Sequence, residues 1–427
     1  MAIKISGTAV ITDSRVITNL GQPLAISQGG LGVTSAGTVG SILVSDGTRF
    51  VSRPLVTATS VAYGWGYNSQ GQIGDNTTTD RSSPVTVVGG ITNWKQLATG
   101  ADSNSFHALG VTQDGIAYAW GSNSFGRLGD NTTTNRSSPV TVVGGITNWA
   151  QLAAGSSNSL GLTQAGIAYA WGTNTLGKLG DNTTTDRSSP VTVVGGITNW
   201  QQLSANATAS GGVTQGGIAY AWGDNSYGQI GDNTTTNRSS PVTVVGGITT
   251  WTQLAVGASH KLGLTQAGIV YAWGLNFEGR LGDNTITSRL SPVTVVGGIT
   301  NWAQLSAGGK HNLGVTHSGI AYAWGNNYSG RLGINSQSSF GVNNNRSSPV
   351  TVVGGITNWQ QVVAGGGHSL GVTQAGIAYA WGDGLGVGDN TNTNRSSPVT
   401  VAGGITNWAQ LAGGDRKSFG ITTAYSV

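Results

Sequence analysis

Carboxylates and guanidinium groups recur six residues apart along this 427-residue chain. A carboxylate beside a cation is the basis of ion pairs and of acid–base chemistry, because the cation lowers the carboxyl pKa. A catalytic pair would not be needed six times. We therefore interpret the pairs as loop braces, in which Asp turns the backbone and Arg holds the following strand. The copies are Asp75/Arg81, Asp130/Arg136, Asp181/Arg187, Asp232/Arg238, Asp283/Arg289 and Asp389/Arg395.

The unit that contains Trp324 lacks the aspartate of this pair. Ile334 stands where the aspartate is expected, and the loop that follows is six residues longer. Arg346 is therefore expected to find another partner or to point to solvent.

Histidines are the second group with possible chemistry. His260, His311 and His368 occupy one equivalent position in three units, His107 aligns with them, and Asn158, Ala209 and Lys417 fill that position elsewhere. Equivalent positions of separate units lie apart, so these side chains are not expected to share a metal ion, and a structural role in a turn is favoured. Glu278 is the one glutamate. No catalytic residue, metal site or cofactor is predicted, and the chain is not expected to be an enzyme.

Tryptophan spacing indicates which elements position these side chains. A Trp-Gly motif recurs every 51 to 57 residues, and a second tryptophan series runs beside it, which together account for all 14 tryptophans. A period near 50 residues is typical of propeller blades and large solenoid units. Each unit contains about four short apolar runs separated by Gly and Pro, which predicts four strands. The Trp-Gly series is Trp65, Trp120, Trp171, Trp222, Trp273, Trp324 and Trp381, and we expect these indoles to pack between neighbouring units.

The chain ends favour a closed ring over an open solenoid. The last unit has its KSFGIT strand but no following YAWG strand, whereas the first begins at SVAYGWG without a preceding LGLT-like strand. The halves complement each other, so residues 417–422 are predicted to pair with residues 61–65 and to remove the exposed edges. The sequence thus predicts an all-β, seven-bladed β-propeller of four-stranded blades over residues 59–427, closed by N- and C-terminal strands.

The repeat resembles that of the regulator of chromosome condensation family. The segment GSSNSLGLTQAGIAYAWGTNTLGKLGDN carries the resemblance, and related segments extend it over residues 61–427. It implies a seven-bladed propeller. The founding member is a nucleotide exchange factor for a small GTPase and binds chromatin, but its interaction loops lie outside the repeat motif. A fold does not fix a function.

Variation among the seven units indicates where binding is expected. It gathers in the loop within WG-x-N-x-x-G-x and in the loop before the LG strand, which emerge on the same face because antiparallel strands alternate direction. Aromatic and cationic loop residues are typical of recognition surfaces, although drift after duplication is an open alternative. The candidates are Tyr67, Phe125, Arg127, Lys178, Tyr227, Lys261, Phe277, Arg280, Lys310, Tyr328 and Arg331.

Charge and composition exclude several classes of protein. The net charge is +4, only 8% of residues are charged, and no basic run exceeds Arg416-Lys417, so nucleic-acid binding is not expected. Cysteine is absent, which excludes disulfides and thiolate metal sites. No apolar run approaches a membrane span, and the N-terminus lacks the pattern of a secretory signal.

The first 58 residues form a separate, β-rich segment too small to fold stably alone. Two strands are predicted around Asp13-Ser14 and two around Asp46-Gly47. The stretch GGLGVTSAGTVGSILVSDGTRFV is similar to segments of tailed-bacteriophage tail-fibre and other virion proteins. The resemblance implies a virion protein, anchored through residues 1–58 to other virion proteins, trimeric, and displaying a propeller that binds host-surface glycan or protein.

Other functions remain open at this point. They are a capsid or tail decoration protein without receptor binding, an intracellular regulatory propeller acting on a GTPase or as a protein-interaction platform, and a bacterial surface adhesin.

Overall fold

The computed structural model describes residues 58–425 except 103–104 and 339–343, together with four short strands nearer the N-terminus. The chain divides into two compact units. One comprises residues 60–423, and the other comprises residues 1–59 with 424–427.

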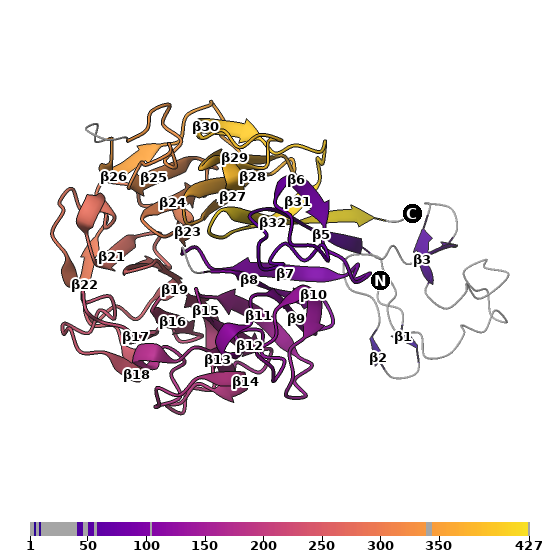
Figure 1. Cartoon of the computed structure of the whole chain (residues 1–427), viewed down its shortest axis with the longest axis horizontal. Coiled ribbons are helices and arrows are strands. Elements are labelled where there is room, and N and C mark those ends of the chain that lie inside the picture. Colours follow the sequence, from indigo (N-terminus) through magenta and orange to yellow (C-terminus); the bar gives the residue numbers. More distant parts are fainter. Residues whose placement is uncertain are drawn as a thin grey trace. The chain divides into compact units, whose positions relative to one another are not determined.

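The larger unit is a ring of seven four-stranded antiparallel sheets, the blades, arranged around a central axis (Figure 1). This confirms the predicted all-β seven-bladed propeller. Along the chain the blades are β7–β10, β11–β14, β15–β18, β19–β22, β23–β26, β27–β30 and finally β31, β32, β5 and β6, numbered here as blades 1 to 7.

Equivalent strands have nearly the same length in every blade. The first strands, nearest the axis, are β7 (Trp94–Thr99), β11 (Trp149–Ala154), β15 (Trp200–Ala205), β19 (Trp251–Val256), β23 (Trp302–Ala307), β27 (Trp359–Ala364) and β31 (Trp408–Gly413). The second strands are β8 (His107–Thr112), β12 (Asn158–Thr163), β16 (Ala209–Thr214), β20 (His260–Thr265), β24 (His311–Thr316), β28 (His368–Thr373) and β32 (Lys417–Tyr425).

The two outer strands of each blade flank the most variable loop. The third strands are β9 (Ala117–Gly121), β13 (Ala168–Gly172), β17 (Ala219–Gly223), β21 (Val270–Gly274), β25 (Ala321–Gly325), β29 (Ala378–Gly382) and β5 (Ala58–Gly66). The fourth strands are β10 (Arg136–Thr141), β14 (Arg187–Thr192), β18 (Arg238–Thr243), β22 (Arg289–Thr294), β26 (Arg346–Thr351), β30 (Arg395–Thr400) and β6 (Arg81–Thr86). Short helical turns lie at Ser124–Gly126 (η1), Thr175–Gly177 (η2), Phe277–Gly279 (η3) and Gly384–Val387 (α1).

The apolar core consists of seven clusters, one at each interface between blades. Between blades 1 and 2, for example, Leu109 and Val111 pack against Trp149 and Trp171. A glycine in the second strand provides the space for the first-strand indole, because a Cβ at Gly161 would lie 2.3 Å from Trp149 Cζ3. All seven Trp-Gly tryptophans are fully buried, as the sequence predicted for packing between units.

The fourth strands form the outer edge of each blade, and each contains a proline that protects this edge from pairing with another sheet. Each has the sequence Arg-Ser/Leu-Ser-Pro-Val-Thr and is partly exposed. Proline has no N–H to donate and is therefore confined to edge strands, where it discourages pairing with another sheet.

Blade 7 closes the ring as predicted. Its strand order is β31-β32-β5-β6, so the C-terminal strand lies between β31 and the early strand β5. Thr422 Oγ1 donates to the carbonyl of Val61 across this junction.

A belt of glutamines joins the first strands of neighbouring blades, and the sequence analysis did not identify it. Gln96 Nε2 donates to the carbonyl of Leu152 at 3.1 Å, and the Leu152 N–H donates back to Gln96 Oε1 at 2.9 Å. The pattern repeats around the ring until Gln410 of blade 7 makes the same two bonds with Leu97 of blade 1. The other members are Gln151, Gln202, Gln253, Gln304 and Gln361.

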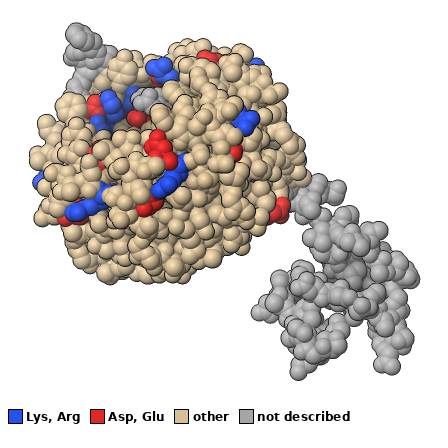
Figure 2. All heavy atoms as spheres, turned by 60° about the horizontal axis from the view of Figure 1, so that its bottom comes forward, with Lys and Arg blue, Asp and Glu red and all other residues tan. Residues whose placement is uncertain are grey.

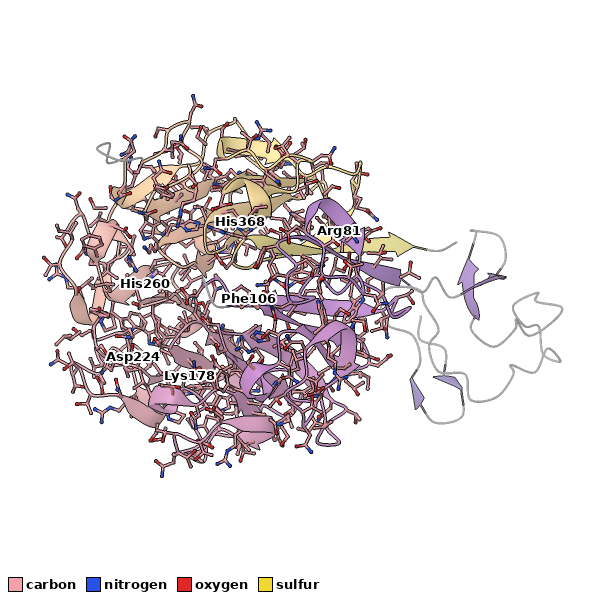
Figure 3. The ribbon with its side chains drawn as sticks, in the orientation of Figure 1. Arg81, Phe106, Lys178, Asp224, His260 and His368 are labelled. Carbon is pink, nitrogen blue, oxygen red and sulfur yellow. The ribbon has the colours of Figure 1, made fainter. Side chains whose placement is uncertain are left out.

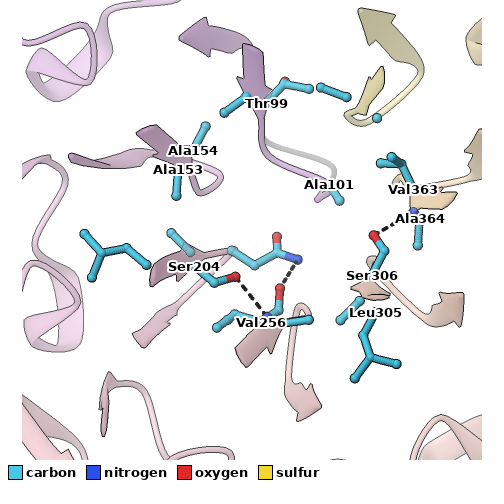
Figure 4. Close-up of a pocket in the computed structure, with 18 of the residues that line it drawn as sticks. Thr99, Ala101, Ala153, Ala154, Ser204, Val256, Leu305, Ser306, Val363 and Ala364 are labelled. Carbon is cyan, nitrogen blue, oxygen red and sulfur yellow. Dashed lines mark hydrogen bonds between the residues drawn. The ribbon is translucent and has the colours of Figure 1, made fainter. Parts of the chain in front are cut away.

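The belt surrounds a narrow channel lined by the first strands, with a volume of about 230 Å³. Ala, Ser and Thr side chains line it together with Gln, Leu and Val side chains, and some of these residues bond across blades (Figure 4). The Val256 N–H donates to Ser204 Oγ at 3.1 Å, and the Ala364 N–H donates to Ser306 Oγ at 2.9 Å. The channel is therefore part of the scaffold.

The N-terminal unit contains two short hairpins in its described residues. β3 (Ser41–Ser45) pairs with β4 (Phe50–Pro54), which confirms the hairpin predicted around Asp46-Gly47. β1 (Lys4–Ile5) pairs with β2 (Thr8–Ala9), and the hairpin predicted around Asp13-Ser14 lies outside the described residues. Among the residues that the structure describes, no helix is long and apolar enough to cross a membrane.

Candidate functional site

The face that carries the variable loops is the candidate site. On this face emerge the loops between first and second strands and the loops between third and fourth strands, as the sequence predicted. The recurrent TQAG-type turns join second and third strands at the opposite face. We call the first of these surfaces the loop face.

Aspartate–arginine pairs brace the base of the third-to-fourth-strand loops, as predicted. Asp130 Oδ2 lies 3.1 Å from Arg136 Nη2, and the other five pairs lie at 2.5 to 3.0 Å. Burial alone would raise the pKa of Asp130, but hydrogen bonds from Thr132, Asn123 and Arg136 outweigh it and lower the pKa. Where Ile334 replaces the aspartate, Arg346 Nη1 donates to the carbonyls of Asn344 and Asn345.

The structure turns five of the six candidate cations inward. Arg127, Lys178, Arg280 and Arg331 are at least nine-tenths buried, Lys261 is fully buried, and only Lys310 is exposed. Arg127 Nη1 donates to Ser156 O, Lys178 Nζ to Ala207 O and Arg331 Nη1 to Gly366 O, all on the next blade. Arg127, Lys178 and Arg331 therefore connect neighbouring blades, whereas Arg280 bonds to Phe277 and Glu278 of its own loop.

Burial also changes how strongly these cations hold their protons. It lowers the pKa of Lys178 to about 8 and that of Lys261 to about 7. Lys261 Nζ donates to the Gln229 carbonyl of the preceding blade at 2.7 Å. Lys178, and His260 next to Lys261 in the chain, are labelled in Figure 3.

In the loop between the third and fourth strands, the side chain that follows the recurrent glycine, Gly126 in blade 1, determines the orientation of a nearby peptide bond. In blade 1, Arg127 Nε donates to the carbonyl of Ser124, and Phe125 adopts the left-handed conformation with φ of 66°. In blade 3, Gln229 Oε1 instead accepts from the N–H of Tyr227, whose φ is not positive. The donor Arg127 thus bonds to the carbonyl of the 124–125 peptide, and the acceptor Gln229 bonds to the N–H of the equivalent 226–227 peptide. The two peptides therefore have opposite orientations.

This difference makes a testable prediction. The Arg127→Gln substitution is expected to rotate the 124–125 peptide and to move Phe125 out of the left-handed region, which costs a non-glycine residue roughly 1–2 kcal/mol. A crystal structure of the variant measures φ directly. Gln229→Arg is the reciprocal variant and should move Tyr227 to positive φ, whereas retention of both wild-type conformations would contradict the explanation.

The aromatic candidates remain exposed at the loop tips. Tyr328 is 59% exposed, Phe277 66%, Phe125 54% and Tyr227 46%, whereas Tyr67 is half-buried and packs near Phe106. Among the described residues, three further large apolar side chains are exposed: Leu176 in the third-to-fourth-strand loop of blade 2, and Ile286 and Leu290 in blade 4. Exposed aromatic side chains on loops held by a rigid scaffold are typical of interaction surfaces.

A pocket of about 480 Å³ opens among these loops. Figure 2 shows charged side chains gathered around a hollow on one face of the otherwise mostly uncharged surface. The pocket residues that bear charge are Asp102, Glu278, Lys310, Arg331 and Asp415, and Tyr328 and Asn326 also line it. Asp102 and Asp415 were not among the predicted site residues, although both are charged residues in variable loops.

The histidines lie deeper, between the blades, and do not line the pocket. Ser159 Oγ donates to the Arg127 carbonyl at 2.8 Å, so the same hydroxyl accepts from His107 Nε2–H at 3.0 Å. His311 and His368 make the equivalent bonds to Ser369 and Ser418. In the part of the chain that the structure describes, no three His, Asp or Glu side chains are placed to hold a metal ion.

The Trp-Gly tryptophans complete this layer of contacts. Trp171 Nε1 donates to the same Arg127 carbonyl at 3.0 Å, so one loop carbonyl accepts from both a serine and an indole of the next blade. The other six indoles bond in the same way to carbonyls of the preceding blade. Beneath the loop face, these indole and serine groups therefore hydrogen-bond to loop carbonyls of the preceding blade.

Comparison with known proteins agrees with this architecture. The regulator of chromosome condensation (RCC1) repeat pattern matches residues 114–162, 216–264, 267–315 and 318–372, and a second form of it matches residues 99–127. The ultraviolet-B receptor UVR8 of Arabidopsis thaliana is 31% identical over 343 residues, covering 76% of this chain and 74% of UVR8. The human E3 ubiquitin-protein ligase HERC2 is 28% identical over 76% of this chain, which spans only 7% of HERC2.

Solved structures share the fold. Yeast RCC1 (Prp20) in complex with Kap60 superposes with a TM-score of 0.77 and 21% identity, covering 87% of this chain and 90% of that one. Human WBSCR16 gives a TM-score of 0.73 at 18% identity, covering 87% and 99%. Together, the repeated motif, the closed ring of seven blades and the similarity to UVR8 show that this chain belongs to the regulator of chromosome condensation (RCC1) repeat family.

Proposed function

We propose that this chain is a non-enzymatic, protein-binding propeller whose loop face receives the partner. The exposed aromatic side chains of that face carry the proposal, because the scaffold holds about half or more of the surface of each of them in water. Aromatic residues are enriched at protein interfaces, where they supply large contact areas at low conformational cost.

The relatives support an interaction role. One yeast RCC1 structure is a complex with Kap60, and a second structure, of Prp20p from Saccharomyces cerevisiae, was described together with the binding of that protein to Gsp1p and histones. These partners belong to those proteins, and the shared feature that we extend to this chain is the use of the propeller as a protein-binding platform.

Photo-crosslinking tests the proposal. Benzoylphenylalanine placed at Phe277 or Tyr328, in cells that produce the protein, is expected to give adducts with the same protein partner, because both positions are exposed on the loop face. His317 is also exposed but lies in a turn on the opposite face, so benzoylphenylalanine there is the matched control.

Alanine substitution of the exposed aromatic residues distinguishes crosslinking to a specific partner from crosslinking by random encounters. The Phe125→Ala, Tyr227→Ala, Phe277→Ala and Tyr328→Ala variant is expected to lose the adduct formed through a probe at Tyr67, with stability changed little because these side chains are exposed. Adducts of equal yield from His317, or adducts unaffected by the four substitutions, would contradict binding by the loop face.

The virion role predicted from the N-terminal segment remains a separate prediction. Its anchoring to other virion proteins, its trimeric state, its location on a particle and its binding of host-surface glycan rest on residues 1–58, of which residues 10–40 lie outside the described residues, and none of the relatives reported above supports them. A phage particle would be one setting in which a protein-binding propeller is displayed.

A further inference from the structure

The pocket on the loop face contains departures from the repeat that gather in one place. Asp415 occupies a position where the other six units have Ala101, Ser156, Ala207, Ala258, Gly309 and Gly366. Glu278 stands where other units have Gln, Phe, Leu, Tyr or Ser, and Asp102 belongs to a loop that is longer in blade 1. Because the seven units are copies of one another, they show that none of these three carboxylates is needed to build a blade.

Of the two cations that line the pocket, Arg331 is already bonded to protein groups. Arg331 donates to the carbonyls of Tyr328 and Gly366 at 2.9 and 3.0 Å. Arg280, which is not among the residues that line the pocket, forms an ion pair with the pocket residue Glu278 at 2.8 Å. Lys310 is exposed and therefore free to move away from a ligand.

Asp415 differs from these groups. It is half-buried, and among the described residues it has no hydrogen-bond or ion-pair partner. Its Oδ1 lies so close to Gly366 that a Cβ there would be 2.6 Å away. Burial raises the pKa of Asp415, and the charges of Lys417 and Arg416 only partly offset this. A half-buried carboxylate without a partner is unfavourable until a cation pairs with it.

Asp102 lines the same pocket, and its carboxylate can accept further hydrogen bonds. Its Oδ2 accepts from Ser156 Oγ at 3.2 Å, and no bond to its Oδ1 occurs within the described residues. Tyr328 lines the rim with most of its surface exposed, and an aromatic face attracts a guanidinium group. A carboxylate with free oxygens and an aromatic ring are the groups that bind arginine best.

We infer that the pocket receives an arginine side chain of the partner protein, with Asp415 and Asp102 accepting from its guanidinium and Tyr328 covering it. This inference rests on the proposed function and specifies the chemistry of the partner segment. The volume of about 480 Å³ is sufficient for one such side chain and its adjoining backbone.

A titration with N-acetyl-arginine-amide, followed by backbone amide chemical shifts, tests the inference. The full chain is expected to bind it saturably, with shifts at Gly366 and Asp415, and to bind the uncharged citrulline analogue at least tenfold more weakly. Asp415→Asn should weaken arginine binding at least tenfold, and Lys310→Glu should strengthen it by removing an ammonium from the rim.

Asp114→Asn is the matched control, because Asp114 is an exposed carboxylate on the opposite face that accepts from Asn93. It should leave binding unchanged. Thermal unfolding of Asp415→Asn verifies folding, and Asp102→Asn provides a second variant. Equal binding of arginine and citrulline, or no effect of Asp415→Asn, would overturn the inference. If the Phe277 crosslinks persisted in that case, the proposed function would stand and only the arginine pocket would fail.

Discussion

Lowering the pH from 6.5 to 4.5 is expected to destabilise the propeller by on the order of 10 kcal/mol, because four histidines are buried in the neutral form. His107, His260, His311 and His368 are fully buried. Burial lowers the pKa of His260 to about 3 and that of His368 to about 4, and it holds those of His107 and His311 well below 6.5.

The geometry explains why these rings stay neutral. Each Nε2–H donates to a serine or asparagine oxygen of the next blade, while the described structure offers no partner to the four Nδ1 atoms. A proton on Nδ1 would therefore be a buried, unsatisfied charge. Positive neighbours add to the lowering of the pKa at His107, which Arg127 and Lys417 face, and at His311, which Arg331 faces, whereas Asp383 partly opposes it at His368.

The sign and the pH window follow from the direction of the shift. A folded-state pKa below the unfolded value means that the unfolded chain binds the proton first, so stability is complete above about pH 6.5 and is lost as the pH falls. At pH 4.5 the neutral forms of His260 and His368 together account for roughly 4–5 kcal/mol of the loss, and His107 and His311 add to it in the same direction. Asp130 and its equivalents have lowered pKa values and titrate below this window, whereas Asp415, with a raised pKa, acts in the opposite direction.

Denaturant unfolding measured between pH 7 and 4 checks this prediction. Blade 2 supplies the control, because Asn158 occupies the histidine position and its Nδ2 lies 3.4 Å from Ser210 Oγ. Replacing all four histidines with asparagine should remove most of the pH dependence between 6.5 and 4.5. An unchanged acid transition in that variant would show that other groups cause it.

Removing residues 417–427 is expected to abolish cooperative folding of the ring. The deletion takes away β32, the strand between β31 and β5, and with it the buried Phe419 and Ile421. Two sheet edges in the ring interior would then have no partner, and unpaired edges promote aggregation. Each large side chain removed from the core costs about 2–5 kcal/mol before the lost backbone bonds are counted.

Thermal unfolding and size-exclusion chromatography measure the result. The truncated chain should aggregate or unfold without a sharp transition. A chain shortened only by residues 424–427 retains the buried part of β32 and should behave like the full-length chain. A monomeric truncated protein that melts within a few degrees of the full chain would rule out a role for closure in stability.

Sequence periodicity was sufficient to predict the blades, their closure and the Asp–Arg braces. The two tryptophan series fix the repeat, and the half-units at either end of the chain have only one way to complete a blade. Arg346 was correctly expected to differ because Ile334 removes its carboxylate. These predictions succeeded because each depends on residue type and spacing within one unit.

Contacts between units were harder to predict. Gln96 and its equivalents appear in the sequence as partly polar strand residues, and only the ring geometry brings them to a leucine of the next blade. Arg127 and Lys178 were expected on the surface because their loops are variable, yet they reach carbonyls of the next blade. The sequence carries one signal for this role: the residue after the loop glycine is Arg, Lys or Gln in every blade except blade 6, where the loop after Trp381 is shortened.

Residue-resolved hydrogen exchange of the glutamine belt tests the closed ring most directly. Seven backbone amides donate to glutamine Oε1 atoms across the seven blade interfaces: Leu97, Leu152, Leu203, Leu254, Leu305, Val362 and Leu411. If the ring opens only by global unfolding, all seven are expected to exchange with the same free energy, including Leu97 at the junction of blades 7 and 1. Exchange at Leu97 that is orders of magnitude faster than at the other six would show that the ring opens between blades 7 and 1, and would contradict the account.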